Sequence, residues 1–372
     1  MSDPMDVLVV DDSPVVRQTL KLVLGADPSL RVTAYGDPTV ALERAIATGP
    51  AAIVLDLMMP GMDGIAFLER LMAARPVPVV VCSGAAAAGS DAAMRALAAG
   101  AIDVVPKPTE GVRRFLEGDG ERLLRIVKSA AQGRIRPRTP MPALAPTASR
   151  APPPLASRAP RPMPSPPRAA PAPLTGAGDD VLLAIAASTG GTEALAEVLR
   201  RVSPDSPPIV VVQHMPPGFT ATFARRLDGL SPMHVAEATD GEVLRRGHVL
   251  VAPGGRHLRV ARQGARLVAR VDDGERVSRH RPSADALFHS VADACGPRAV
   301  GVVLTGMGDD GARGLLAMRQ RGAETFVQDE ASSVVWGMPG AAVALGAARE
   351  VVALALVPET LRAATQRVRA RA

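Results

Sequence analysis

The chain has 372 residues, of which 47% are hydrophobic and 22% are charged, a composition that excludes a largely disordered polypeptide and allows two domains of ordinary size. A formal net charge of +6 is compatible with nucleic-acid binding, so the position of that charge has to be considered. Between Gly133 and Gly178 there are seven arginines and no lysine, aspartate or glutamate, which leaves the rest of the chain at about −1. The folded parts are therefore not basic, and we expect no nucleic-acid partner.

Apolar strands followed by polar residues recur through the first 125 residues. Strands are expected at 7–10, 53–55, 77–81 and 102–105, and the polar residues at their carboxyl ends are Asp11, Asp12, Asp56, Ser83 and Lys107. Open parallel α/β sheets place their ligands at these strand ends. A carboxylate accepts a phosphoryl group only if a cation offsets the added charge, and hard oxygen ligands suit Mg²⁺. Taken singly, the acidic pair could cap a helix and the lysine could face solvent, but the joint order predicts a phosphorylation switch.

The segment from Ile53 to Gly64, together with the Lys107-Pro108 pair, resembles a two-component response-regulator receiver domain. The resemblance implies a doubly wound five-stranded sheet that accepts phosphate from a histidine kinase. Val104 occupies the position where many receivers carry an aromatic residue that takes part in signal relay, so the relay is not predicted.

The same resemblance implies a role for each strand-end residue. Asp56 would be the phosphoacceptor, and Ser83 and Lys107 would hold the phosphate oxygens. Mg²⁺ would be bound by Asp11, Asp12, Asp56 and the carbonyl of Met58.

The chain then changes composition. Residues 126–178 are dominated by Pro, Ala, Ser and Arg without apolar periodicity, which predicts a semi-extended linker between a receiver at 1–125 and a second domain at 179–372. The linker is expected to be a spacer, although docking of a partner by its arginines stays open.

Nothing in the sequence predicts export or membrane insertion. Residues 1–6 carry acid rather than the basic run of a signal peptide, and no apolar run reaches the length of a membrane span. Cys82 and Cys295 form neither a disulfide framework nor a metal-binding spacing. We therefore expect a cytoplasmic protein.

In the second domain, strands again alternate with helices. Strands are expected at 181–187, 209–212, 249–252, 266–271 and 300–304, and helices at 192–202, 284–294, 314–321 and 359–369. The pattern predicts a mostly parallel α/β sheet with some antiparallel additions.

Three strand ends in this domain carry candidate catalytic residues: Ser188, His214 and Asp310. A serine hydroxyl becomes a nucleophile when an imidazole takes its proton, and a carboxylate fixes the tautomer of that imidazole. Gly190 and Gly191 let backbone amides approach a reacting carbonyl and stabilise an oxyanion. The trio alone leaves ordinary roles open, because a serine can sit in a turn, a histidine in a loop and an aspartate at a helix cap.

Five stretches look like the catalytic domain of the chemotaxis protein-glutamate methylesterases, the CheB family. They are 187–193, 213–219, 250–255, 304–311, and a fifth that covers 328–332 and then 336–339. The match covers essentially the whole chain, since this family also has a receiver, a linker and a catalytic domain in that order. Ala186 departs from the family, which often has glycine there.

The resemblance implies a phosphorylation-activated serine esterase that demethylates glutamate methyl esters, and deamidates glutamines, on methyl-accepting chemotaxis receptors. Ser188 would be the nucleophile, His214 the general base and acid, and Asp310 the orienting carboxylate, with no cofactor in the esterase reaction. Met307 would line the site, and Asp309 would be structural or a surface acid. The unphosphorylated receiver would pack over the catalytic cleft.

Several alternatives remain. A DNA-binding output would require a basic helix-turn-helix after the linker, whereas the second domain is rich in strands and not basic. A non-catalytic adaptor with the same fold would not need the intact trio. The other histidines, at 234, 248, 257, 280 and 289, show no metal-ligand spacing and are expected to be surface or packing residues, although the segments around His257 and His280 could help hold a substrate helix.

Overall fold

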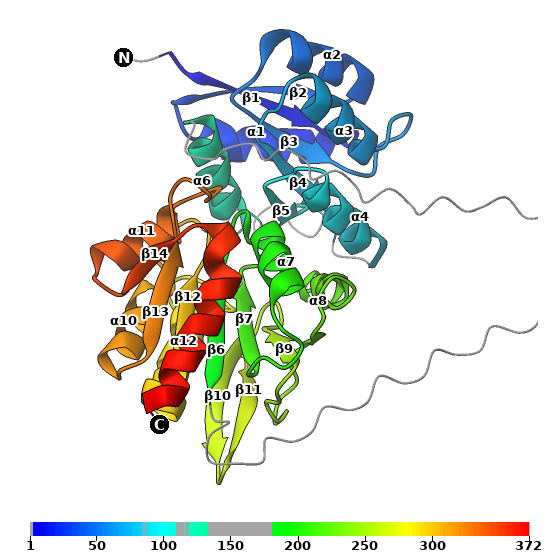
Figure 1. Cartoon of the computed structure of the whole chain (residues 1–372). Helices are drawn as coiled ribbons and strands as arrows, with labels where there is room; N and C mark the ends of the chain where they lie inside the picture. Colours follow the sequence, from blue (N-terminus) through cyan, green and yellow to red (C-terminus); the bar gives the residue numbers. More distant parts are fainter. Residues whose placement is uncertain (1–2, 85–86, 109–114, 116–118, 133–180, 372) are drawn as a thin grey trace, which may run out of the picture.

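The computed structural model describes residues 3–84, 87–108, 115, 119–132 and 181–371. They form two α/β units, each built on its own parallel sheet (Figure 1). The expected linker lies largely outside the described residues. Its first residues do not: the boundary expected after residue 125 falls inside a helix that continues to Ala131.

The first unit contains a five-stranded sheet with the order β2-β1-β3-β4-β5, parallel throughout. Its strands are β1 (Met5–Val10), β2 (Leu30–Tyr35), β3 (Ala52–Asp56), β4 (Val79–Ser83) and β5 (Asp103–Pro106). Its helices are α1 (Pro14–Gly25), α2 (Pro38–Thr48), α3 (Gly64–Ala74), α4 (Ala87–Ala98) and α6 (Asp119–Ala131). This arrangement confirms the doubly wound receiver fold.

Side chains of alternate strand residues bury both faces of this sheet. Val7 and Val9 belong to a cluster with α1 and α6, whereas Leu8 and Val10 belong to a cluster with α2, α3 and α4. A strand with helices on both faces needs apolar residues at successive positions, and the run from Val7 to Val10 has them. The strand ends are thereby fixed by a core on each side.

The second unit contains a seven-stranded sheet with the order β14-β13-β12-β6-β7-β9-β8, again parallel throughout. Its strands are β6 (Leu182–Ala187), β7 (Ile209–Gln213), β8 (His234–Glu237), β9 (His248–Val251), β12 (Ala299–Val303), β13 (Glu324–Gln328) and β14 (Glu350–Val352). The antiparallel addition is a separate ribbon of β10 (His257–Gln263) and β11 (Arg266–Asp272). The expected mostly parallel α/β architecture is confirmed.

Helices cover both faces of this sheet as well. They are α7 (Gly191–Arg201), α8 (Thr220–Asp228), α9 (Ala284–Cys295), α10 (Ala312–Gln320), α11 (Gly337–Ala344) and α12 (Val357–Arg371), with short 3-10 helices η1 (Gly296–Arg298) and η2 (Leu354–Leu356). Buried residues of α7, α8 and α12 pack on one face, and those of α9, α10, α11 and the β10–β11 ribbon pack on the other. Among the described residues, no helix combines the length and apolarity needed to cross a membrane.

The two units are in contact. Helix α4 of the first unit lies beside α7 and α8 of the second. Helix α6 also points from the first unit toward the second (Figure 1). Two hydrogen bonds join the units at one place: Gly190 N donates to Ile102 O at 3.1 Å, and Thr189 Oγ1 donates to Asp103 Oδ2 at 2.8 Å. Both involve residues that directly follow Ser188.

Candidate active site and phosphoacceptor site

Asp310 lies in the loop between β12 and α10, is fully buried, and directs its carboxylate at the N-terminus of α9. Its carboxylate accepts hydrogen bonds from the backbone amides of Ala284 and Asp285, at 2.7 and 3.0 Å, and from Ser283 Oγ at 2.8 Å. Burial alone would raise the pKa of Asp310, but the hydrogen bond and charge of His214, together with the two amides, lower it to about 2. The side chain is therefore a fixed anion at neutral pH.

His214 follows β7 and is bound to this anion. Its Nε2 lies 2.8 Å from Asp310 Oδ2, and because a carboxylate only accepts, Nε2 carries the proton. The other ring nitrogen, Nδ1, is buried and has no hydrogen-bond partner among the described residues. The imidazole is thus held in the tautomer whose free lone pair is on Nδ1, which makes Nδ1 the atom able to take a proton.

Ser188 is brought beside His214 by strand register. Ala187 of β6 pairs with Gln213 of β7, so the next residue on each strand is Ser188 and His214, and His214 N donates to Ala187 O at 3.1 Å. The Ser188 amide donates to Thr305 O at 3.0 Å. The two residues are neighbours on one rim of the sheet, although Nδ1 does not accept a hydrogen bond from the serine hydroxyl. Such bonds are often long before a substrate binds.

The turn after Ser188 requires its two glycines. Gly190 has φ 77°, and a Cβ there would come 2.6 Å from Val334 Cβ. A Cβ on Gly191 would overlap Gln213 Oε1. The amides of both are in use: Gly191 N donates to Ser188 O at 2.7 Å, and Gly190 N donates to Ile102 O of the receiver unit. While the two units are in contact, the amide of Gly190 is therefore engaged by Ile102 O.

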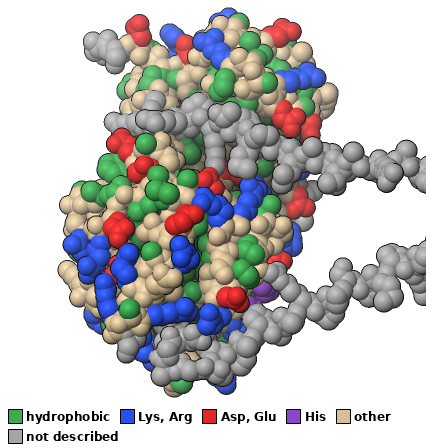
Figure 2. Space-filling model, viewed as in Figure 1, with side chains coloured by type: hydrophobic (Ala, Val, Ile, Leu, Met, Phe, Trp, Pro, Cys, Tyr) green, Lys and Arg blue, Asp and Glu red, His purple; other side chains and the backbone are tan. Residues whose placement is uncertain are grey.

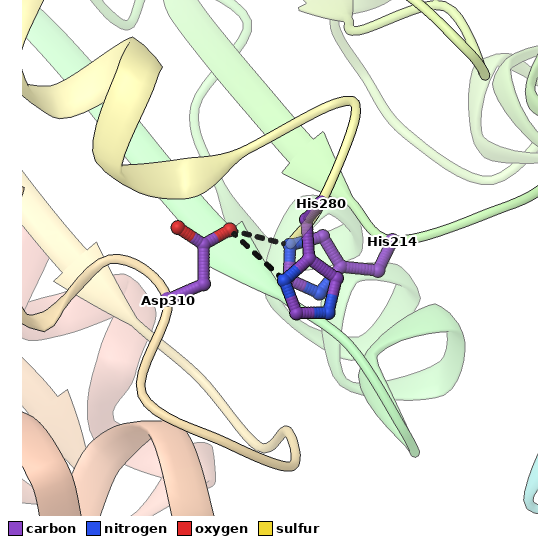
Figure 3. A group of neighbouring side chains, drawn as sticks. All are labelled: His214, His280 and Asp310. Atoms are coloured by element: carbon purple, nitrogen blue, oxygen red, sulfur yellow. Dashed lines mark hydrogen bonds and ion pairs between the residues drawn. The ribbon is translucent and has the colours of Figure 1, made fainter. Parts of the chain in front are cut away.

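His280 is a residue of this site that the sequence did not identify. Its ring stacks on that of His214, with centroids 4.0 Å apart and an interplanar angle of 4° (Figure 3). Its Nδ1 donates to Ser278 O at 2.6 Å and lies 3.9 Å from Asp310 Oδ2. Burial and the charge of His214 lower the pKa of His280 to about 3, so the ring is neutral. The sequence predicted a surface or packing role for His280, or a part for its segment in holding a substrate helix; the ring packs on His214, three residues before Ser283, the N-cap of α9.

His214, His280 and Asp310 also have the composition of a metal site, with ligand atoms within 4.8 Å of one another. The geometry favours a hydrogen-bonded pair of His214 and Asp310 instead. The two rings are parallel, so their in-plane lone pairs do not converge on one point, and the nitrogens facing Asp310 both carry protons. Figure 3 shows both rings edge-on to the carboxylate.

A small cavity of about 70 Å³ opens beside Ser188. Met307 lies in its wall, as the resemblance implied. The rest of the wall comes from both units: Arg122 and Arg125 belong to α6 of the first, and Arg279 and His280 belong to the second. Asp309 is about half exposed and pairs with Arg279 at 3.3 Å and with Arg313 at 3.9 Å, in keeping with the surface acid that was expected.

Four of the five strand-end residues in the first unit lie together, and three of them are directly connected. Lys107 Nζ lies 2.6 Å from Asp56 Oδ2 and 3.3 Å from Asp11 Oδ2, while Asp12 is exposed beside them. The fifth, Ser83, is buried and follows Cys82, the register partner of Asp56. Burial, opposed by the charge of Lys107, raises the pKa of Asp11.

The carboxylates of this cluster fit a divalent cation. Ligand oxygens of Asp11, Asp12 and Asp56 lie within 4.8 Å of one another, and Asp11 Oδ2 is buried without a well-formed hydrogen bond among the described residues. Met58 N donates to Asp56 Oδ1 at 3.1 Å, which places the Met58 backbone at the same carboxylate. Val104 is buried in β5, away from solvent.

Comparison with known proteins agrees with this geometry. Residues 183–361 match the family described as CheB methylesterase, and residues 7–114 match the response regulator receiver domain. The chain is 49% identical over 99% of both chains to protein-glutamate methylesterase/protein-glutamine glutaminase 1 of Xanthomonas euvesicatoria pv. vesicatoria. It is 52% identical to the protein of that name from Anaeromyxobacter dehalogenans, covering 96% of this chain and 98% of the relative.

Among solved structures, the CheB methylesterase catalytic domain of Thermotoga maritima is similar at 36% identity, covering 49% of this chain and 96% of that one with a TM-score of 0.48. The matches along the whole sequence establish the family. The chain belongs to the CheB family of response-regulator methylesterases.

Proposed function

We propose that this protein is a phosphorylation-activated serine esterase that hydrolyses glutamate γ-methyl esters on methyl-accepting chemotaxis receptors and deamidates glutamines there. The observation that carries the proposal is the buried Asp310–His214 pair beside Ser188, on a chain that belongs to this family. The activity follows the family, and the roles of individual residues are argued from their geometry.

The reaction begins at Ser188. Its Oγ attacks the γ-carbonyl carbon of the substrate side chain while His214 Nδ1 takes the hydroxyl proton. Asp310 stabilises the resulting imidazolium through Nε2, which is already hydrogen-bonded to it. The tetrahedral intermediate collapses, the methoxy group leaves as methanol with the proton from Nδ1, and an acyl-serine remains.

Water completes the cycle. His214 Nδ1 takes a proton from water, the hydroxide attacks the acyl carbon, and Ser188 recovers its proton as the glutamate carboxylate departs. A primary amide follows the same steps with ammonia as the leaving group, which accounts for glutamine deamidation at one site.

Regulation is proposed to act on the turn after Ser188. Ile102 and Asp103 of the receiver hold Gly190 and Thr189, so the docked receiver occupies an amide that an oxyanion needs and narrows the cavity over the serine. Lys107, which binds Asp56, lies just beyond the other end of the same short strand β5. Phosphorylation of Asp56 would change the partner of Lys107, and a shift of β5 would release both contacts.

The phosphorylation chemistry belongs to the first unit. We propose that a histidine kinase is the phosphodonor and that Asp11, Asp12, Asp56 and the Met58 carbonyl would hold Mg²⁺, which when bound offsets the charge of the phosphoryl group. Ser83 and Lys107 would bind the phosphate oxygens. The receptor substrate implies a cytoplasmic setting.

Methanol release from methylated receptor tests the catalytic roles. Ser188→Ala should abolish it, because no other hydroxyl is placed by register beside His214. Undiminished release by that variant would remove Ser188 as the nucleophile.

A further inference from the structure

Arg279 stands at the edge of the candidate active site on a strained turn. Val277 and His280 exchange backbone hydrogen bonds of 3.1 and 2.9 Å, and the two residues between them have positive φ, 49° at Ser278 and 67° at Arg279. Neither is glycine, so this conformation is costly and has to be held by its surroundings. The turn positions His280 so that its ring stacks on that of His214, and it leaves the Arg279 side chain 71% exposed.

Arg279 lines the same small cavity as Ser188 and Met307. Its acidic neighbour is Asp309, at 3.3 Å, an exposed and therefore weak pair. This places a cation with spare donors beside the residue that attacks the substrate.

The docked receiver does not complement that cation. The receiver's part of the cavity wall includes Arg122 and Arg125 of α6. Arg122 is paired with Asp103 at 2.7 Å. Arg125 forms no ion pair among the described residues, and burial together with the charges of Arg279 and Arg122 lowers its pKa. No acidic residue lines the cavity among the described residues, so the docked receiver offers Arg279 no carboxylate there and does not explain an arginine at this position.

We propose that Arg279 binds a carboxylate of the protein substrate close to the scissile ester once the receiver has moved away. The inference rests on the proposed function for the substrate class, a glutamate-bearing helix. On such a helix, side chains three or four residues apart lie about 5–6 Å from each other, within reach of a long arginine beside the nucleophile. An arginine fork also matches a carboxylate in geometry. Arg279 is then a specificity-determining residue, and Ser188, His214 and Asp310 do the chemistry.

The test compares two substrates in the full-length protein saturated with phosphodonor. For methylated receptor, Arg279→Gln should raise KM about tenfold with little change in kcat. For a small neutral ester, which has no carboxylate to bind, kcat/KM should be unchanged. Arg279→Lys should recover part of the loss because the charge is kept.

Arg313→Gln is the matched control, since Arg313 approaches the same Asp309 but is not part of the cavity wall. It should leave both substrates unaffected. If Arg279→Gln changed kcat/KM equally for both substrates, the variant would be acting on receiver docking. If its KM for receptor were unchanged, Arg279 would not bind substrate. Either result overturns the proposal. Absence of ester hydrolysis by the unmodified protein would instead refute the proposed function itself.

Discussion

The hydrogen bond between Asp103 and Thr189 offers a direct way to loosen the receiver without touching the catalytic residues. Asp103→Ala removes the acceptor of Thr189 Oγ1, which is 2.8 Å away, and both residues are buried. The variant also removes an ion pair with Arg122 inside the receiver, whereas the backbone contact between Gly190 and Ile102 remains. We expect the docked arrangement to weaken and the unphosphorylated enzyme to become more active.

The size of the effect follows from the chemistry of the bond. A hydrogen bond to a charged group contributes about 1.5–3 kcal/mol, which corresponds to a change of about 10- to 150-fold in the ratio of docked to undocked protein. If the docked form dominates before phosphorylation, basal kcat/KM should rise by up to that factor. The rise should stop at the rate of the phosphodonor-stimulated unmodified protein, because that rate represents full release.

The assay is hydrolysis of a small neutral ester with and without phosphodonor. Asp6→Ala is the control, since it removes an exposed receiver ion pair with Arg31 at 2.5 Å. Thr189→Val and the double variant complete a thermodynamic cycle, in which the two changes should be strongly non-additive. Basal activity equal to that of the control, or additive effects in the cycle, would refute the regulatory role of this contact.

Three further predictions concern the triad. Asp310→Asn should lower kcat about 10³- to 10⁴-fold in receptor demethylation with little change in KM, because the tautomer of His214 is no longer fixed; a loss under tenfold would contradict the assignment. The pKa of Asp310 is about 2 in the folded protein and 3.8 for the free side chain. This difference stabilises the fold by about 2 kcal/mol above pH 4, and the stabilisation is lost as the pH falls through 2. Urea denaturation of the unmodified protein should show this loss between pH 4 and 2, whereas Asp310→Asn should show a flatter dependence over that range. His280 has a pKa of about 3 and stays neutral, so His280→Phe should keep much of kcat and the shape of the pH–rate profile between pH 5 and 9. His280→Ala, which removes the stacked ring, should lose about tenfold in kcat. A change in the shape of the profile of the Phe variant would give His280 a titrating role.

The positions of the triad could be predicted because each residue follows a strongly apolar strand. Ser188 and His214 follow apolar segments that predict buried parallel strands, and neighbouring parallel strands have their carboxyl ends on the same rim of a sheet. Asp310 is further from its strand, in the glycine-rich stretch 305–311 that precedes the next helix. The local pattern therefore predicted that these three residues share one rim, and the family resemblance implied their catalytic roles.

Strands β13 and β14 were not predicted, because their sequences lack the apolar pattern of buried strands. Strand β13 begins with Glu324, whose charge is offset by Arg367 and Arg371 of α12 at 3.0 and 2.7 Å, partners that lie more than forty residues away. Strand β14 has three residues, and two of them are exposed. Neither length nor alternation marks such strands in the sequence.

The contacts around the site could not be predicted from sequence patterns either. The stacking of His280 on His214 depends on a turn with positive φ at Ser278 and Arg279, residues that rarely adopt it. The bond from Gly190 to Ile102 depends on how two separately folded units meet. Family resemblance indicated that the receiver covers the cleft, but the atoms involved come from the structure alone.

The central claim is that phosphorylation of Asp56 governs the esterase activity of Ser188. Demethylation of receptor by full-length protein, measured as methanol release with and without phosphodonor, tests it in one experiment. The account predicts stimulation of the unmodified protein, basal but unstimulated release by Asp56→Asn, and none by Ser188→Ala. Full stimulation of Asp56→Asn, or release by Ser188→Ala equal to that of the unmodified protein, would contradict it.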